Sequence, residues 1–100
     1  MPTLMVLYPT PTDADTFSRR YRDEHAPMVA EHLSTARFKA YRVVGSPAGP
    51  PPYALVAQLA FDSDAAMQAA LGTPGGQATA AHAGEISSGG PPVLLVCEEA

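Results

Sequence analysis

The fold is decided by the stretch Tyr53-Ala54-Leu55-Val56-Ala57-Gln58-Leu59-Ala60-Phe61, which is apolar on both sides of an extended chain. Successive side chains of a strand point to opposite faces, so the odd-numbered residues share one face and the even-numbered residues share the other. Gln58 is the one polar side chain on the even-numbered face. A strand that is apolar on both faces needs one layer of structure above it and another below it. We therefore expect a strand here, with cover on both sides.

The segments on either side of this strand alternate between strand and helix signals. Three further strands are expected at Thr3–Tyr8, Phe38–Gly45 and Val93–Cys97. Helical regions are expected behind polar caps. Thr12 or Asp13 can cap a helix that runs to about Leu33, Asp62 or Ser63 can cap Ala65–Leu71, and Thr73 can cap a weaker piece that runs to about Ala83. The order β-α-β-β-α-β predicts an α+β fold with a ferredoxin-like subunit, whose antiparallel four-stranded sheet carries both helices on one face. We expect a single domain covering residues 1–100.

The sheet face opposite the helices lacks a cover within this chain. The first strand offers Leu4 and Val6 to one side and Met5 and Leu7 to the other, and the last strand is also apolar on both sides. Leaving such side chains in water costs about 25 cal/mol per Å² of apolar surface. We therefore expect a homodimer in which the two sheets pack face to face.

The composition excludes several classes of protein. The net charge is −4 and the lysines and arginines form no basic cluster, which argues against a nucleic-acid partner. No apolar stretch approaches the roughly 20 residues of a membrane span, and Met1–Tyr8 lacks the charged leader of a signal peptide, so we expect no membrane partner and a cytoplasmic protein. The single cysteine, Cys97, falls inside the last apolar run, where we expect a buried and unreactive thiol.

The first helix contains the stretch Tyr21-Arg22-Asp23-Glu24-His25-Ala26-Pro27. Residues four apart lie on one helix face, so Phe17, Tyr21 and His25 form one stripe that places an imidazole among aromatic side chains. Proline inside a helix removes a backbone hydrogen bond. Pro27 therefore predicts a kink or an interruption between about Glu24 and Met28, next to a histidine that faces the sheet.

His25 is the leading functional residue that the sequence offers. A partly buried imidazole has a pKa near neutrality, which suits general acid or base catalysis, and Tyr21 could donate a hydrogen bond to a developing enolate. Phe17, Tyr41 and Gln58 are expected to line the same pocket and to contact a substrate. The alternative is that His25 is a core residue satisfied by a carbonyl that Pro27 leaves free, with Tyr21 as packing.

The remaining histidines, His32 and His82, stand among polar or small residues and are expected at the surface. The three histidines show no metal-ligand spacing, and the chain has no nucleophile motif, phosphate-binding loop or dinucleotide fingerprint. We therefore expect no metal and no cofactor. Haem chemistry is a distant third possibility, because no residue has the pattern that it requires.

The pattern Phe17-x-x-x-Tyr21-x-x-x-His25-x-Pro27-Met28-Val29 resembles the first helix of the EthD family, small proteins of the dimeric α+β barrel superfamily. The similarity continues in Tyr8-Pro9, in the strand that Pro51-Pro52 precedes, and in Pro92-Val93. It implies a barrel with the helices outside and a small-molecule cavity between the first helix and the sheet. Relatives often carry an aspartate near the position where this chain has His82, so the role of that aspartate is not carried over.

Two functions follow from these observations. The first is a cofactor-independent enzyme that isomerises, cyclises or dehydrates a small apolar metabolite, such as an aromatic, polyketide-like or lactone compound, with His25 and Tyr21 as catalytic residues. The second is a non-catalytic accessory protein that binds such a metabolite in a degradative or biosynthetic pathway, with His25 in a structural role.

Overall fold

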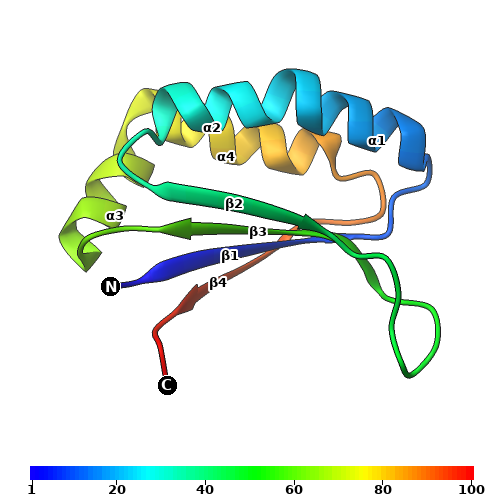
Figure 1. The fold of residues 1–100 in the computed structure, drawn as a ribbon. Helices are drawn as coiled ribbons and strands as arrows, with labels where there is room; N and C mark the ends of the chain where they lie inside the picture. The colour runs from blue at the N-terminus through cyan, green and yellow to red at the C-terminus, as the bar shows by residue number, and fades with distance from the viewer.

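A four-stranded antiparallel sheet carries all the helices on one face in the computed structural model, which describes residues 1–100 (Figure 1). The strands lie in the order β2-β3-β1-β4, which is the ferredoxin-like arrangement and confirms the predicted fold class. The strands are β1 (Thr3–Pro9), β2 (Arg37–Arg42), β3 (Tyr53–Ala60) and β4 (Val93–Cys97). The helices are α1 (Ala14–Arg20), the π-helical turn η1 (Tyr21–His25), α2 (Ala26–His32), α3 (Asp64–Gly72) and α4 (Pro74–Ile86).

Three of the helices begin at the side-chain caps that the sequence predicts. The carboxylate of Asp13 accepts a hydrogen bond from the Thr16 N–H at 3.1 Å at the start of α1. Ser63 and Thr73 accept in the same way at the starts of α3 and α4. Each cap satisfies a backbone donor that the first helical turn leaves free. Helix α4 continues three residues beyond the predicted Ala83, to Ile86.

The predicted interruption of the first helix is confirmed, and it takes the form of the π-helical turn η1. The Ala26 N–H donates to the Tyr21 carbonyl, five residues back instead of four. The turn begins at Tyr21, three residues before the predicted start of the interruption at Glu24. A π-helical turn contains one residue more than an α-helical turn, and this extra residue lies before Pro27. Pro27 then lies in the first turn of α2, directly after η1, where its fixed φ suits the helix.

The core lies between the helices and the face of the sheet that they cover. Tyr8 and Phe61 are its largest fully enclosed side chains. The strands contribute Leu4, Val6, Ala57 and Leu59, and the helical layer contributes Phe17, Tyr21, Val29, Leu33, Met67, Ala83 and Ile86. The alternation along β1 and β3 thus brings one apolar set inward, as the period of two requires.

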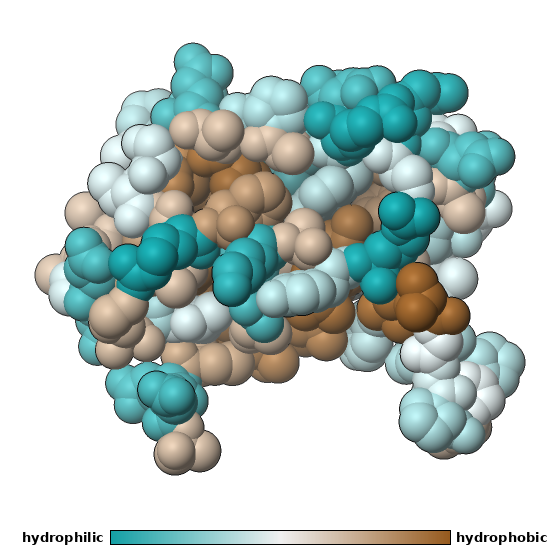
Figure 2. All heavy atoms as spheres, viewed as in Figure 1, coloured by the Kyte–Doolittle hydropathy of each residue, from teal (hydrophilic) through white to brown (hydrophobic).

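The opposite face of the sheet is uncovered in the single chain, and it is apolar over β1 and β4. Met5 pairs with Leu95, and Leu7 pairs with Val56, so their side chains share this face. Leu95 keeps 48% of its surface exposed. Figure 2 shows hydrophobic atoms along the underside of the sheet, away from the helices. Cys97, the last residue of β4, is only half-buried in the single chain, so the predicted burial of its thiol is wrong. No helix has the length and apolarity needed to cross a membrane.

Candidate functional site

His25 lies at the end of η1 and points into the layer between the helices and the sheet. Its side chain is buried, and its Nε2 lies 3.3 Å from the hydroxyl oxygen of Tyr8 on β1. The Tyr21 ring lies on the same helical face, with its centroid 5.4 Å from that of His25. Turns of π-helix are frequent at functional sites, and this one brings two titratable side chains to the sheet.

His82 meets His25 from the other side, which corrects its expected place at the surface. Its side chain is only 12% exposed, and its Nδ1 lies 3.0 Å from Nδ1 of His25. The two rings are nearly parallel, with an interplanar angle of 7°. The placement follows from α4, which passes beside η1 and buries Thr79 and Ile86. The spacing 79–82–86 is that of one helix face, and this signal could have identified His82 from the sequence.

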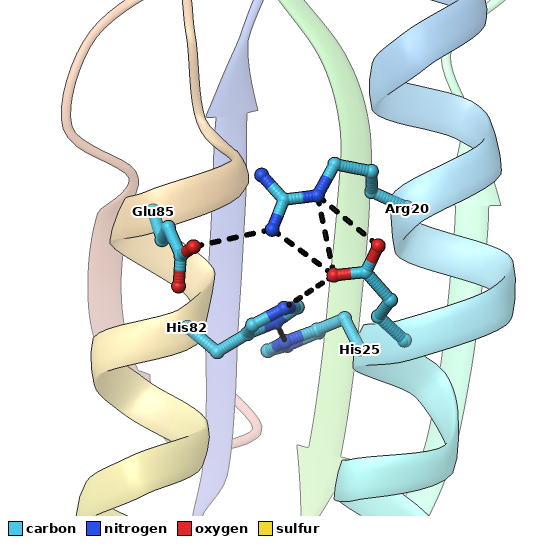
Figure 3. Close-up of polar contacts among 5 residues, drawn as sticks. Arg20, His25, His82 and Glu85 are labelled. Atoms are coloured by element: carbon cyan, nitrogen blue, oxygen red, sulfur yellow. Dashed lines mark hydrogen bonds and ion pairs between the residues drawn. The ribbon is translucent and has the colours of Figure 1, made fainter.

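Glu24 and Arg20 extend this contact to the surface (Figure 3). The second ring nitrogen of His82, Nε2, lies 3.1 Å from a carboxylate oxygen of Glu24. Arg20 donates to Glu24 at 3.0 Å and to Glu85 on α4 at 3.2 Å. Polar contacts therefore run without a break from the buried hydroxyl of Tyr8 to the exposed side of the helical layer.

The buried groups of this chain are uncharged at neutral pH. Burial, with a smaller contribution from the neighbouring His82, lowers the pKa of His25 to about 4. The expected pKa near neutrality is therefore wrong, because the imidazole is more completely enclosed than a partly buried histidine. Burial raises the pKa of Tyr21 to about 12 and also raises the pKa of Tyr8. A neutral imidazole thus lies beside two protonated phenols.

A small cavity of about 50 Å³ lies beside His25, between the sheet and helices α2 and α4. Tyr8, Tyr21 and His25 supply its titratable lining, and the other side chains are mainly aliphatic. A water molecule needs roughly 10–15 Å³ of such space, so the cavity has room for a few waters or for the reacting end of a small molecule.

A larger groove of about 580 Å³ opens between α1 and the adjoining ends of β2 and β3. Phe17 and Leu55 line its apolar part, and Arg22 and Arg42 lie at it as well. This volume falls within the usual range for small-molecule sites. Tyr21 is the one residue that lines both the groove and the small cavity.

The hydroxyl of Tyr21 is buried and has no hydrogen-bond partner within the protein. Leaving such a group unsatisfied costs roughly 1–3 kcal/mol, so native structures rarely do so without a reason. The hydroxyl is consequently available to a bound ligand or a water molecule. Tyr21, which the sequence predicts as a site residue, thus has a hydroxyl that is free to bind a ligand.

The structure brings together only some of the predicted site residues. His25 and Tyr21 line the small cavity, and Phe17 lines the groove. Tyr41 and Gln58 lie elsewhere, so their predicted place in the helix–sheet pocket is wrong. Tyr41 pairs with Val56 and is 50% exposed on the face away from the helices, and Gln58 pairs with Met5 on that same face. The parity of β2 decides this, because Phe38 takes the position that faces the helices.

Sequence reasoning missed Tyr8 as well as His82. Tyr8 ends the inward-facing series Leu4, Val6 and Tyr8 of β1, so its inward direction follows from the alternation. Its contact with His25 depends on the docking of η1 over β1, which no local pattern shows. No group of three histidine, cysteine, aspartate or glutamate side chains is placed to hold a metal ion.

Comparisons with known proteins identify the family of this chain. Residues 9–88 match the EthD domain. A protein of Rhodococcus erythropolis, described as an uncharacterized 11.0 kDa protein in the thcB-thcC intergenic region, is 34% identical over 94 residues, which are 94% of this chain and 91% of that protein. The crystal structure of an EthD-family protein from Bacillus halodurans has a TM-score of 0.91 at 29% identity, over 100% of this chain and 99% of that one.

A more distant structure shares the fold alone. It is a dimeric ferredoxin-like protein of unknown function from Jannaschia, with a TM-score of 0.74 at 14% identity over 99% of this chain and 100% of that one. The match over residues 9–88 and the Rhodococcus relative decide the family, and they confirm the predicted resemblance. The chain therefore belongs to the EthD family.

Proposed function

We propose that this protein binds a small apolar metabolite, such as an aromatic, polyketide-like or lactone compound, and moves a proton on it without a cofactor. Isomerisation, cyclisation and dehydration are the reactions of this class. The observation that carries the proposal is a neutral, buried His25 beside a small cavity, next to a Tyr21 hydroxyl that lacks a protein partner.

His25 and Tyr21 have complementary roles in this proposal. A neutral imidazole can accept a proton from an acidic C–H or O–H group, here through the Tyr8 hydroxyl that lies against its Nε2. Acid–base catalysis of this kind is worth roughly 10²- to 10⁴-fold in rate. The Tyr21 hydroxyl can donate a hydrogen bond to the oxyanion that forms as the proton leaves. The groove beside Phe17 has the volume for the body of the ligand, and the small cavity can take its reacting end.

We also propose that the protein works as a homodimer joined through the uncovered sheet face. The apolar side chains of that face, including Leu7, Val56 and Leu95, support this proposal, as does the dimeric state of the Jannaschia protein. In such a dimer Tyr41 and Gln58 lie near the interface between the sheets, on the far side of the sheet from His25.

A second function is favoured by one feature of His25. Both of its ring nitrogens already have partners in the protein, Tyr8 and His82, which is what a structural histidine requires. A non-catalytic accessory protein would then use the groove to bind the metabolite and would use His25 to hold η1 against the sheet.

Deuterium exchange distinguishes the two functions without knowledge of the substrate. A panel of aromatic ketones, polyketide fragments and lactones is incubated with the protein in D₂O, and deuterium at the acidic C–H positions is measured by mass spectrometry. Ligand-observed NMR measures binding in parallel. We expect catalysed exchange that falls about a hundred-fold in His25→Gln while binding persists.

The control for this experiment is His32→Gln, which changes a histidine outside the cavity that pairs with Glu31. It should leave exchange and binding at the wild-type level. If wild-type protein binds members of the panel without catalysing exchange on any of them, the accessory function replaces the enzyme.

A further inference from the structure

We propose that His82, held by Glu24, fixes which nitrogen of His25 carries its proton and links the small cavity to solvent as a proton relay. His82 is a positioning residue in this scheme, because it acts on the cavity through His25. The catalytic meaning of the relay rests on the proposed function, whereas the hydrogen-bond direction on which it depends follows from the contacts of Glu24, His82 and His25.

The direction of the hydrogen bonds starts at Glu24. The guanidinium of Arg20, and then the imidazole of His82, lower the pKa of Glu24, so this side chain is a carboxylate and can only accept. His82 Nε2 must therefore carry a hydrogen and donate it to Glu24 across 3.1 Å. A neutral His82 then has an unprotonated Nδ1, which must accept from Nδ1 of His25 across 3.0 Å.

His25 completes the series toward the cavity. Its single proton lies on Nδ1, so its Nε2 is unprotonated and accepts the hydroxyl hydrogen of Tyr8 across 3.3 Å. Every donor in the series thus meets an acceptor, and Nε2 of His25, which faces Tyr8, has the form of a base. No other assignment of a neutral pair satisfies an ionised Glu24.

Protonation of His82 reverses the state of His25 at the cavity. Both nitrogens of an imidazolium donate, so His25 Nδ1 must become the acceptor and its proton must lie on Nε2. His25 stays neutral, but it now donates to Tyr8 and has the form of an acid. One proton bound at His82 therefore exchanges base for acid at the cavity without placing a charge there.

The relay also moves protons in a balanced way. A proton that reaches the Tyr8 oxygen from the cavity releases the phenolic proton to His25 Nε2. The Nδ1 proton of His25 passes to His82 Nδ1, and the Nε2 proton of His82 passes to Glu24, where water removes it. The net result is one proton moved to solvent with both imidazoles neutral. The reverse series returns the proton and restores the starting tautomers.

The groups that face His25 come from three elements. They are Tyr8 on β1, Tyr21 on η1 and His82 on α4. The charged groups Arg20, Glu24 and Glu85 reach it only through His82. Because the two phenols are protonated at neutral pH, the state of His25 depends on His82 and on the carboxylate behind it.

The test is the tautomer of His25, measured by ¹⁵N NMR of the imidazole nitrogens in the full chain without ligand. At pH 8 we expect the Nδ1–H form of His25 to exceed the Nε2–H form by about tenfold or more, because a hydrogen bond to a charged group contributes that much. On lowering the pH we expect His25 to change to the Nε2–H form in the same transition in which His82 becomes protonated. An Nε2–H form at pH 8, or an unchanged His25 while His82 titrates, would overturn the proposal.

Two variants and one matched control sharpen the test. His82→Phe keeps a flat ring against His25 but removes its acceptor, and should move His25 to the Nε2–H form at pH 8. Glu24→Ala removes the acceptor of His82 and should reduce the excess of the Nδ1–H form of His25. Because Glu24 is exposed, this variant tests the proposal even if His82→Phe does not fold. Glu85→Gln changes only the outer partner of Arg20 and should leave the tautomer as in the wild type.

If both substitutions leave the tautomer of His25 unchanged, the relay is wrong. The proposed acid–base function is tested separately by the deuterium exchange of His25→Gln, because the tautomer is measured without substrate.

Discussion

The two faces of the sheet both carry apolar side chains, yet only one of them buries titratable groups in contact with one another. The helix-covered face buries Tyr8 against His25. The uncovered face combines apolar side chains such as Leu7 and Leu95 with the polar or charged side chains of Lys39, Tyr41 and Gln58. The difference comes from the helical layer, since the sheet supplies only Tyr8 to the histidine series. An apolar strand thus predicts burial, but the element that covers it decides whether the site has chemistry.

The largest expected difference between the faces is in stability. Leu59→Ala removes a core side chain under the helices and should lower the free energy of unfolding by about 2–5 kcal/mol. The matched substitution Leu95→Ala, on the half-exposed far face, should cost less than half as much in the monomer. Urea denaturation at low protein concentration measures both. Equal losses would show that the two faces are not distinct in the single chain.

The next effect concerns assembly. Leu95→Glu places a charge in the proposed interface, where an unpaired charge is costly to bury, and should weaken dimerisation at least a hundred-fold. Sedimentation equilibrium at micromolar concentration should then detect mainly the 10.4 kDa species, against a dimer for the wild type. Glu31→Gln on the helical side serves as the control. If the wild-type protein is monomeric at every concentration measured, the proposed dimer interface on the far face is wrong.

Acid should destabilise the helix-covered face through His25. The folded pKa of about 4 lies below the unfolded value of 6.5, so the unfolded chain binds the proton first as the pH falls. Stability should therefore drop between pH 6.5 and 4, by on the order of 2 kcal/mol at pH 5. His25→Phe should lose this part of the pH dependence, as measured by urea denaturation at pH 7.5 and pH 5. Parallel pH curves for the two proteins would mean that His25 is not buried as a neutral group.

The smallest expected effect separates two tyrosines. Tyr21→Phe removes the unpartnered hydroxyl beside the cavity. It should slow deuterium exchange about tenfold, because the developing negative charge on the ligand loses one hydrogen bond. Tyr41→Phe, on the far face, should leave the exchange rate unchanged. A loss with Tyr41→Phe instead would place the reaction between the sheets.

Much of the fold follows from local patterns in the sequence. The period of two in β3, the caps at Asp13, Ser63 and Thr73, and the proline in the first helix predict the element order and the interruption. These features depend on neighbours within a few residues, so they can be read before the chain is folded.

The site was only partly predictable, because its members come from separate elements. His25 and Tyr21 share one helical turn and were found together, whereas Tyr8 and His82 reach them through the docking of η1 on β1 and of α4 on η1. The pKa of His25 depends on how completely these elements enclose it. The face of Tyr41 was predictable, because Phe38 faces the helices and the period of two then places Tyr41 on the far face.

The π-helical turn also has a consequence for how the chain can change in length. An α-helix advances about 100° per residue, so an added residue would normally rotate everything after it away from the sheet. Here η1 takes up the addition locally, and α1 and α2 both keep their apolar sides, Phe17 and Val29, toward the core. A related chain that is one residue shorter here could keep the same core with an unbroken helix, but Pro27 would then fall inside it. The extra residue and Pro27 are therefore expected to be gained or lost together.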